Sequence, residues 1–294
     1  MAAWAATAPT LGAASSFAVL SAAPNAGGAV SCTTSTVNGD VGSSGAMASV
    51  VNVGCTINGA VVAPVSASVL TGFNNAYGNY AAIPCTDSLN AAYTNATLLL
   101  PPGVYFNAGH SDTAAGVTFT NTTVTLDGTG FTNPVWIFEI SGAGGLTTTD
   151  SSVVMAGGGQ ACDVTWLVED AAGATVTRGD FQGSILAGSA ITMTGLAVIP
   201  TTTSSNGNAL AGAAVTLTNV TVNSCGATQP TACDGDHDGH DGGHDGHDGH
   251  DGHHDGNDGH HDGHDKEHCD NGQHNGHDKD PFGSNDEHGD KGDK

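Results

Sequence analysis

The carboxyl-terminal part of the chain is a near three-residue repeat of His, Asp and Gly, running from Cys233 to Asp265. Neutral imidazoles and carboxylates are ligands of Zn²⁺, Cu²⁺ and Ni²⁺, and a His at about every third place favours these ions over Ca²⁺. We expect weak multisite binding of divalent metal ions here, with no cofactor required. The alternative is a solvated, self-repelling extension that keeps the protein soluble. The candidate ligands are His237, His240, His244, His247, His250, His253, His254, His260, His261 and His264.

Residue types that catalyse reactions are sparse in the rest of the chain. Before Cys233 there is no Lys and a single Arg, Arg178, while the carboxylates are dispersed along the sequence. A β-helical polysaccharide lyase needs clustered carboxylates for Ca²⁺ and a basic side chain as the general base. The run His110-Ser111-Asp112 has the residue types of a catalytic triad. Neighbours in one loop do not reach triad geometry among themselves, so the sequence predicts no enzyme.

The charge divides the chain into two unlike parts. Residues 1–232 carry ten acidic residues and one Arg, a net charge of −9, whereas residues 233–294 carry 19 acidic residues and four Lys, a net charge of −15. The acidic chain has no basic surface for nucleic acid, and no apolar run is long enough to span a membrane. We expect an N-terminal extension at 1–10, a folded domain at 11–226 and a disordered tail at 227–294.

Seven scattered cysteines without a C-x-x-C motif suit an oxidising compartment, in which two or three of them form disulfides. Cys32 and Cys55 are the first pair to expect, because each ends a short strand-like run. The odd number leaves one thiol free or paired between molecules. We expect a secreted, monomeric protein, although the first residues lack the pattern of a signal peptide.

The folded part reads as β-structure with one helix. Short β-branched runs alternate with Gly, Asn and Asp turns. The segments GSILAGSAITMT and GNALAGAAVTLT, which start 24 residues apart, match at nine of twelve positions when the similar pairs Ile/Val and Met/Leu are counted with the seven identities. Such a period is typical of stacked solenoid coils. One segment, 64–83, instead spaces Val69, Phe73, Tyr77 and Tyr80 as an apolar helical stripe, to be packed against the solenoid. Ser66 or Ser68 would cap this helix and Pro84 would end it.

Several motifs occur in the order known from one protein family. They include LGAASSFAVLS, VNGDVGSS, LPPGVYF, PVWIFEI, GQACDVTWLV, FQGSILAGSAIT and GNALAGAAVTL. From Leu11 to about Ser224 the chain resembles the microbial ice-binding (antifreeze) proteins. That resemblance implies a mainly β fold, a right-handed discontinuous β-solenoid (a triangular β-helix) with one long α-helix packed alongside. It also implies adsorption to ice, inhibition of ice growth and recrystallisation, and a role in cold adaptation.

The coil spacing gives a physical reason for such binding. Adjacent strands lie about 4.8 Å apart and alternate residues of one strand about 6.6 Å apart, so Thr side chains on a flat face form a grid close to the repeats of ice. Thr is stiff at χ1 and loses little entropy on binding. The family motif resembles T-[AG]-x-[TN], and its position-by-position transfer implies an ice-binding set. The set comprises Thr120, Thr123, Thr148, Ser151, Thr177, Thr194, Thr218 and Thr221.

Two places depart from the motif. Ala197 stands where a second Thr would follow Thr194, and Thr177 is followed by Arg178 and Asp180 rather than a neutral pair. An Arg178–Asp180 ion pair is therefore expected on or beside the face. The sequence predicts a secreted ice-binding protein; the alternative is a surface or adhesion scaffold whose tail binds metal.

Overall fold

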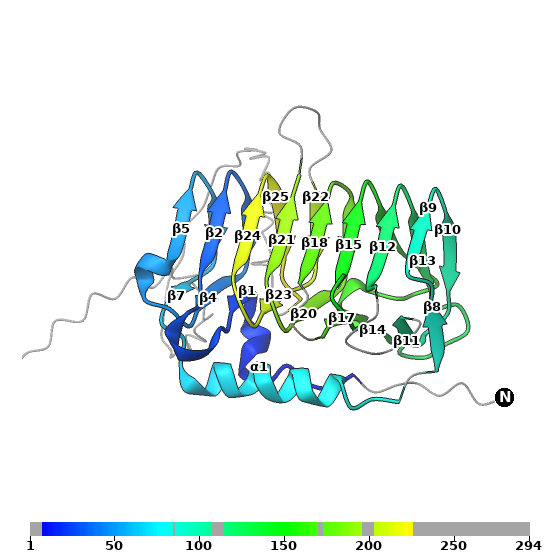
Figure 1. The fold of residues 1–294 in the computed structure, drawn as a ribbon, viewed down its shortest axis with the longest axis horizontal. Coiled ribbons are helices and arrows are strands. Elements are labelled where there is room, and N and C mark those ends of the chain that lie inside the picture. Colours follow the sequence, from blue (N-terminus) through cyan, green and yellow to red (C-terminus); the bar gives the residue numbers. More distant parts are fainter. Residues whose placement is uncertain (1–7, 85, 108–114, 170–172, 196–202, 226–294) are drawn as a thin grey trace, which may run out of the picture. The chain divides into compact units, whose positions relative to one another are not determined.

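The computed structural model describes residues 8–84, 86–107, 115–169, 173–195 and 203–225. About half of these residues belong to short parallel strands that form four sheets, here named A to D (Figure 1). Four short 3₁₀ segments add to the strands: Gly12–Ser16, Pro24–Ala26, Met47–Ser49 and Ala161–Asp163. The predicted mainly β solenoid with a helix alongside is confirmed.

Each turn of the chain contributes one strand to each side of the solenoid. Sheet A contains, in spatial order, β7 (Val61–Val62), β4 (Asp40–Ser43), β1 (Phe17–Ser21), β23 (Ala209–Ala211), β20 (Ser184–Ala187), β17 (Val164–Val168), β14 (Trp136–Ile140), β11 (Gly103–Asn107) and β8 (Asp87–Leu89). Sheet B contains β5 (Val50–Val53), β2 (Val30–Thr33), β24 (Val215–Thr218), β21 (Ile191–Thr194), β18 (Ala174–Thr177), β15 (Leu146–Thr149), β12 (Val117–Thr120) and β9 (Ala92–Thr94).

The third side is divided between two sheets. Sheet C contains β19 (Asp180–Gln182), β22 (Thr203–Asn206), β25 (Val220–Asn223), β3 (Thr36–Asn38) and β6 (Thr56–Asn58). Sheet D contains β10 (Thr97–Leu100), β13 (Thr123–Asp127) and β16 (Ser152–Ala156). No ladder joins the two sheets among the described residues, although β16 and β19 are neighbours.

The stacking order is discontinuous, because the first coils of the chain lie on the last one. Strand β1 pairs with both β4 and β23, with Val19 opposite Ala209. After β7 the chain passes to β8, at the opposite edge of sheet A. Eight strand spacings amount to about 38 Å, a distance that a helix and its flanks bridge compactly.

That bridge is helix α1 (Ala67–Tyr80), which lies along sheet A (Figure 1). Its predicted stripe is confirmed as a packing surface: Val69, Phe73 and Tyr80 are buried against the outer side of sheet A, and Tyr77 is partly buried there. Thr165 donates a hydrogen bond of 3.1 Å to the Tyr80 hydroxyl. Ser66 is the N-cap residue, although its hydroxyl contacts Ser68 at 2.8 Å rather than a backbone N–H.

The core inside the coils is apolar and contains a stack of aromatic rings. Phe138 and Trp166 stack with ring centroids 3.9 Å apart, and Trp166 also contacts Phe119 and Phe181. Its indole nitrogen donates to the backbone oxygen of Gln182 at 2.9 Å, so the only polar atom of this fully buried ring is satisfied. The core therefore fixes the coils against one another.

Two disulfides join parts of the solenoid. The predicted Cys32–Cys55 bond is present and links β2 to the corner between β5 and β6 in the adjacent coil, and a second bond joins Cys162 to Cys225. The other cysteines, Cys85, Cys233 and Cys269, lie outside the described residues.

Removing the second disulfide with Cys162→Ser and Cys225→Ser should lower the free energy of unfolding by about 4 kcal/mol. The bond closes a loop of 63 residues, so its loss frees much unfolded-state entropy. Urea denaturation followed by circular dichroism measures the change. The matched pair Cys32→Ser and Cys55→Ser opens a loop of only 23 residues and should cost about 3 kcal/mol. A loss below about 1 kcal/mol for the longer loop would contradict the prediction.

Candidate functional site

The outer surface of sheet B carries two rows of Thr. Along each strand the residues alternate, as in β24, where Val215 and Leu217 are buried while Thr216 and Thr218 lie on the outside. The strands pair in register, so equivalent outward residues stand opposite one another from strand to strand. Figure 1 shows the eight strands of this sheet side by side.

We name these two rows the Thr surface. The first row, in spatial order, is Ser31, Thr216, Thr192, Thr175, Thr147 and Thr118. The second row is Thr33, Thr218, Thr194, Thr177, Thr149, Thr120 and Thr94. At the ends, Val51 and Val53 of β5 continue the rows on one side, and Ala92 of β9 ends the first row on the other.

The geometry of this surface suits a ligand with a regular lattice. Neighbouring Thr within a row are separated by about one strand spacing, 4.8 Å, and the two rows by about 6.6 Å. No charged side chain stands in either row. The β-branched side chains hold each methyl and hydroxyl in a restricted orientation, so ordering them on binding costs little entropy. The surface can therefore present a fixed array of methyl groups and hydroxyls to water.

A corner of left-handed residues borders the second Thr row. Asn95, Asn121, Asp150, Arg178 and Asn219 follow the last Thr of their strands, and all have φ between 48° and 54°. The conformation turns the chain from sheet B to the third side within one or two residues, and Asn and Asp tolerate it best among non-glycine residues. Neighbouring corners also bond to one another, since the Asn121 amide donates to the Asn95 oxygen at 2.5 Å.

Arg178 forms its ion pair with Asp150 of the adjacent corner, a correction to the expected pair with Asp180. Two guanidinium nitrogens contact the two carboxylate oxygens at 2.5 Å. Asp180 instead begins β19 in sheet C. The hydrogen bond from Arg178 holds the pKa of Asp150 below its usual value and raises the pKa of Arg178. The pair is neutral as a unit and lies beside the Thr surface.

Asp150→Asn leaves Arg178 without its carboxylate partner and should weaken ice-growth inhibition, because an unpaired guanidinium orders water around its own charge. The double variant Asp150→Asn, Arg178→Asn makes this corner resemble its neutral neighbours and should restore the activity. Since the pKa of Asp150 is lowered, the pair persists above that lowered pKa and is lost only as pH falls through it. The difference between the parent protein and Asp150→Asn should therefore be equal at pH 8 and pH 5, and a difference that vanishes at pH 5 would contradict this.

Six of the eight predicted site residues are divided among three sheets. Four members lie together in the second Thr row: Thr120, Thr177, Thr194 and Thr218. Thr123 begins β13 in sheet D, and Thr221 lies in β25 of sheet C. Their assignment to ice contact stays a prediction, and the structure places them on a different side from the other four.

Two members of the predicted set do not reach the surface and are corrected here. Thr148 points into the core between Phe119 and Val176 and is 3% exposed. Ser151 lies under the corner, where its hydroxyl accepts from the Thr122 N–H and donates to the Thr149 oxygen. Ser35 and Thr122 have similar buried positions at their own corners. The hydroxyl of Ser151 therefore braces the turn.

Most of the Thr surface was missed by the transfer of the motif. The missed residues are Ser31, Thr33, Thr94, Thr118, Thr147, Thr149, Thr175, Thr192 and Thr216. A signal for them exists in the sequence as T-x-T at the ends of strands, in VTFT, LTTT, ATVT, ITMT and VTLT. In a strand, residues two apart lie on the same side, whereas residues three apart do not.

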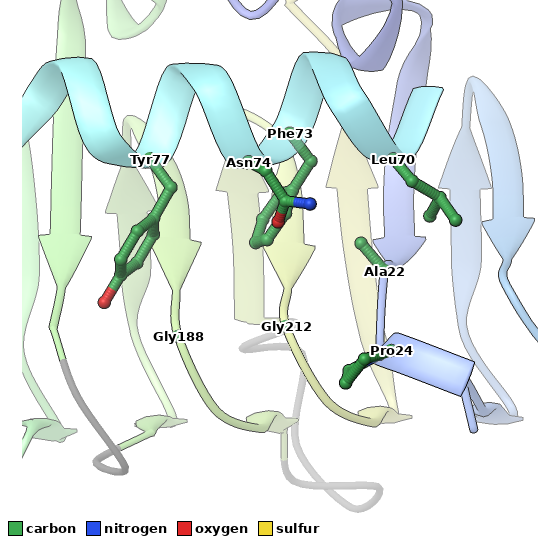
Figure 2. Close-up of a pocket in the computed structure, with 8 residues that line it drawn as sticks. All are labelled: Ala22, Pro24, Leu70, Phe73, Asn74, Tyr77, Gly188 and Gly212. Carbon is green, nitrogen blue, oxygen red and sulfur yellow. The ribbon is translucent and has the colours of Figure 1, made fainter. Parts of the chain in front are cut away.

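A second candidate site is a pocket of about 270 Å³ beside helix α1 (Figure 2). Leu70, Phe73, Asn74 and Tyr77 of the helix line one side, and the turns that follow β20 and β23 line the other. Its lining residues include no acidic or basic side chain.

The described residues contain no group of three or more His, Cys, Asp or Glu placed to hold a metal ion. All ten predicted metal-binding His residues, and the run His110-Ser111-Asp112, lie outside these residues.

Burial raises the pKa of both Tyr80 and Tyr105, which keeps these phenols neutral. In the described ranges, no helix is both long and apolar enough to cross a membrane.

Comparisons with known proteins agree with this architecture. An ice-binding protein from the Antarctic ascomycete Antarctomyces psychrotrophicus is 28% identical, with a TM-score of 0.58, over 74% of this chain and 98% of that one. An ice-binding protein from an Antarctic bacterium of the Flavobacteriaceae is 31% identical, with a TM-score of 0.60, over 75% of this chain. The match spans 49% of that bacterial protein.

An ice-binding protein domain from Shewanella frigidimarina is 25% identical, with a TM-score of 0.56, over 75% of this chain and 98% of that one. A search of curated proteins found no significant match. The sequence profile described as ice-binding-like matches residues 25–223, well over half of the chain. The chain belongs to the ice-binding-like family.

Proposed function

We propose that this protein adsorbs to ice through the Thr surface and thereby inhibits ice growth and recrystallisation. The observation that carries the proposal is the pair of in-register Thr rows on sheet B, free of charged side chains. Similar chains from cold-environment microbes are described as ice-binding proteins, and one from an Arctic yeast is described by its antifreeze activity. No observation on the described residues favours the adhesion scaffold over this function.

The mechanism follows from the array of side chains. Methyl groups of the two rows order the water layer above them, and the hydroxyls anchor that layer to the protein. Because the rows repeat at about 4.8 Å and lie about 6.6 Å apart, the ordered layer matches the ice lattice and merges with it. Many adsorbed molecules then force ice to grow as curved fronts between them, and the curvature lowers the local freezing point.

We further propose that the protein is a secreted, monomeric, non-catalytic protein. The two disulfides support an oxidising compartment, because such bonds persist outside the reducing cytosol. The in-register rows of neutral Thr side chains support a binding role.

Adsorption is tested by freezing the fluorescently labelled full chain into a growing single crystal of ice. We expect the label to be incorporated on defined planes, and crystals grown in its presence to be faceted. A labelled protein of similar size without affinity for ice should be pushed ahead of the front. Exclusion of this chain from the ice would overturn the proposed function.

For the His/Asp/Gly repeat we propose weak binding of Zn²⁺, Cu²⁺ or Ni²⁺, supported by the ten His residues between His237 and His264. Titration calorimetry of the full chain with Zn²⁺ should show several weak sites. Replacing the ten His by Asn should remove most of these sites, while ice-growth inhibition stays unchanged with or without a chelator. Equal Zn²⁺ binding by the Asn variant would contradict the proposal.

A further inference from the structure

Sheet C carries a second ordered array, built from different residues. Its strands repeat the pattern Thr-x-Asn: Thr36 and Asn38 in β3, Thr56 and Asn58 in β6, and Thr221 and Asn223 in β25. The residue between them is apolar and points inward, as Val37 and Val222 do with 0% exposure. The strands pair in register, so one row of Thr and one row of Asn run across the sheet.

The Asn row is a continuous ladder of hydrogen-bonded amides. Asn58 donates to Asn38, Asn38 to Asn223, and Asn223 to Asn206, each at 2.7 Å. Asn206 then donates to Gln182 at 3.0 Å, which ends the ladder at β19. Every bond points in the same direction, so each amide within the ladder is held by both neighbours. One N–H and one oxygen lone pair of each inner amide remain to contact water.

The backbone behind the ladder leaves the amides little freedom to rearrange. A glycine follows both Gln182 and Asn206 in the sequence. The backbones at these two glycines lie so close together that a Cβ on Gly207 would be 2.1 Å from the Gly183 oxygen. Gly207 also has φ of +151°, which L side chains rarely adopt. The turn from sheet C to sheet A is thus fixed immediately after the amide row, and the row has a defined spacing.

Sheet C also shares an edge with the Thr surface. Only Asn219 separates Thr218 of the second Thr row from β25, and the hydroxyl of Thr34 at the neighbouring corner donates to the Asn219 side chain. Ser35 braces the same corner from below by accepting from the Val220 N–H at 3.1 Å. The two arrays are therefore held at a fixed angle by one rigid edge.

We propose that the Thr/Asn array of sheet C is a second ice-binding surface, which adsorbs to a different set of ice planes from the Thr surface. The inference rests on the proposed function. The array meets the same physical requirements: a repeat of one strand spacing along each row, rows two residues apart, and polar groups immobilised before binding. Its chemistry differs, because a row of amides takes the place of one row of Thr. The hydrogen-bond donors and acceptors of the Thr/Asn array are therefore spaced differently from those of the Thr surface, which favours adsorption to a different plane of ice.

Asp180 marks where this array ends. It occupies the position in β19 equivalent to the Thr row, opposite Ser204, and it is exposed. A carboxylate at this position interrupts the row of neutral hydroxyl side chains. The Thr-x-Asn repeat occupies β6, β3 and β25 and the amide ladder continues through β22, whereas the Thr surface extends over seven strands. We expect the sheet C surface to bind ice more weakly.

Labelling of a single-crystal ice hemisphere by the full chain distinguishes the two surfaces. Three variants carry the same bulky change: Thr175→Tyr on the Thr surface, Thr221→Tyr in the sheet C array, and Thr125→Tyr on sheet D as the control. The parent protein should label two sets of planes. Thr221→Tyr should lose one set, Thr175→Tyr should lose the other, and Thr125→Tyr should keep both. Thermal unfolding of each variant verifies that it folds.

The outcomes separate this inference from the function on which it rests. If Thr221→Tyr labels the same planes as the parent protein, the second surface is overturned while ice binding through sheet B stands. If Thr221→Tyr loses all labelling, the two arrays form one surface, and the inference is also overturned. If the parent protein labels no plane, the proposed function itself fails. Asn38→Asp provides a second variant, because a carboxylate interrupts the amide ladder without adding bulk.

Discussion

Thr175→Tyr is expected to lower ice-growth inhibition by at least about tenfold, equivalent to about 1.4 kcal/mol of adsorption free energy. Thr175 lies near the middle of the first Thr row, between Thr147 and Thr192, and it is exposed. A phenol there stands above the plane of its neighbours and holds the remaining Thr side chains away from the ice. The loss should therefore exceed the contribution of one Thr contact.

The measurement is the gap between the melting temperature of an ice crystal and the lower temperature at which the crystal resumes growth. Variant and parent are compared at equal protein concentrations. Thr125→Tyr makes the same change on sheet D, and it should leave the activity unchanged. The melting temperature of Thr175→Tyr should equal that of the parent, because an outward residue adds no strain inside the coil. Full activity in Thr175→Tyr would show that the Thr surface is not the ice-binding surface.

Trp166→Ala is expected to lower the free energy of unfolding by about 3–5 kcal/mol. Trp166 is fully buried in the middle of the solenoid, stacked on Phe138 and in contact with Phe119 and Phe181. Truncation leaves a cavity that the parallel coils, tied by the ladders of sheets A and B, cannot close. It also leaves the Gln182 oxygen without its indole donor.

This loss is measured by urea denaturation, with unfolding monitored by the backbone circular dichroism signal rather than by tryptophan fluorescence. Leu99→Ala is the matched control, because Leu99 is 66% exposed on sheet D and its truncation should change stability by less than about 0.5 kcal/mol. If the two variants lose the same stability, the aromatic stack does not hold the coils together. If Trp166→Ala keeps its fold, its ice-growth inhibition should fall only with the fraction of folded protein.

Much of the fold was predictable from local patterns. The 24-residue repeat predicted stacked coils because repeated segments bury their apolar sides against each other. The stripe from Val69 to Tyr80 predicted helix α1, which the structure ends at Tyr80, before Pro84. The Cys32–Cys55 pair was predicted because the two residues end successive short runs; in the structure Cys32 stands opposite Asn52, and Cys55 reaches it from the corner that follows β5.

The composition of the site was less predictable because it depends on where each coil turns. A motif of two Thr three residues apart extends across the corner, and its second residue lies on another side of the solenoid, as Thr123 and Thr221 do. In β15 the four-residue segment Leu146–Thr149 has three consecutive Thr, and only the pleat decides that Thr147 and Thr149 face outward while Thr148 faces inward. The partner of Arg178 lies 28 residues away in the adjacent coil, a pairing that no local pattern reveals.

The insertion of β1 between β4 and β23 has a consequence for synthesis of the chain. Val19 finds its ladder partner Ala209 only when nearly the whole solenoid has been made, so the first strands leave the ribosome long before one of their neighbours exists. Contacts so distant in sequence slow folding, and unpaired strand edges invite association between nascent chains. Folding therefore depends on the last coil, because β1 and β2 pair with β23 and β24. Until these strands are made, the amino-terminal coils lack a partner in the rest of the solenoid. Truncated chains should consequently fail to fold rather than form shorter solenoids.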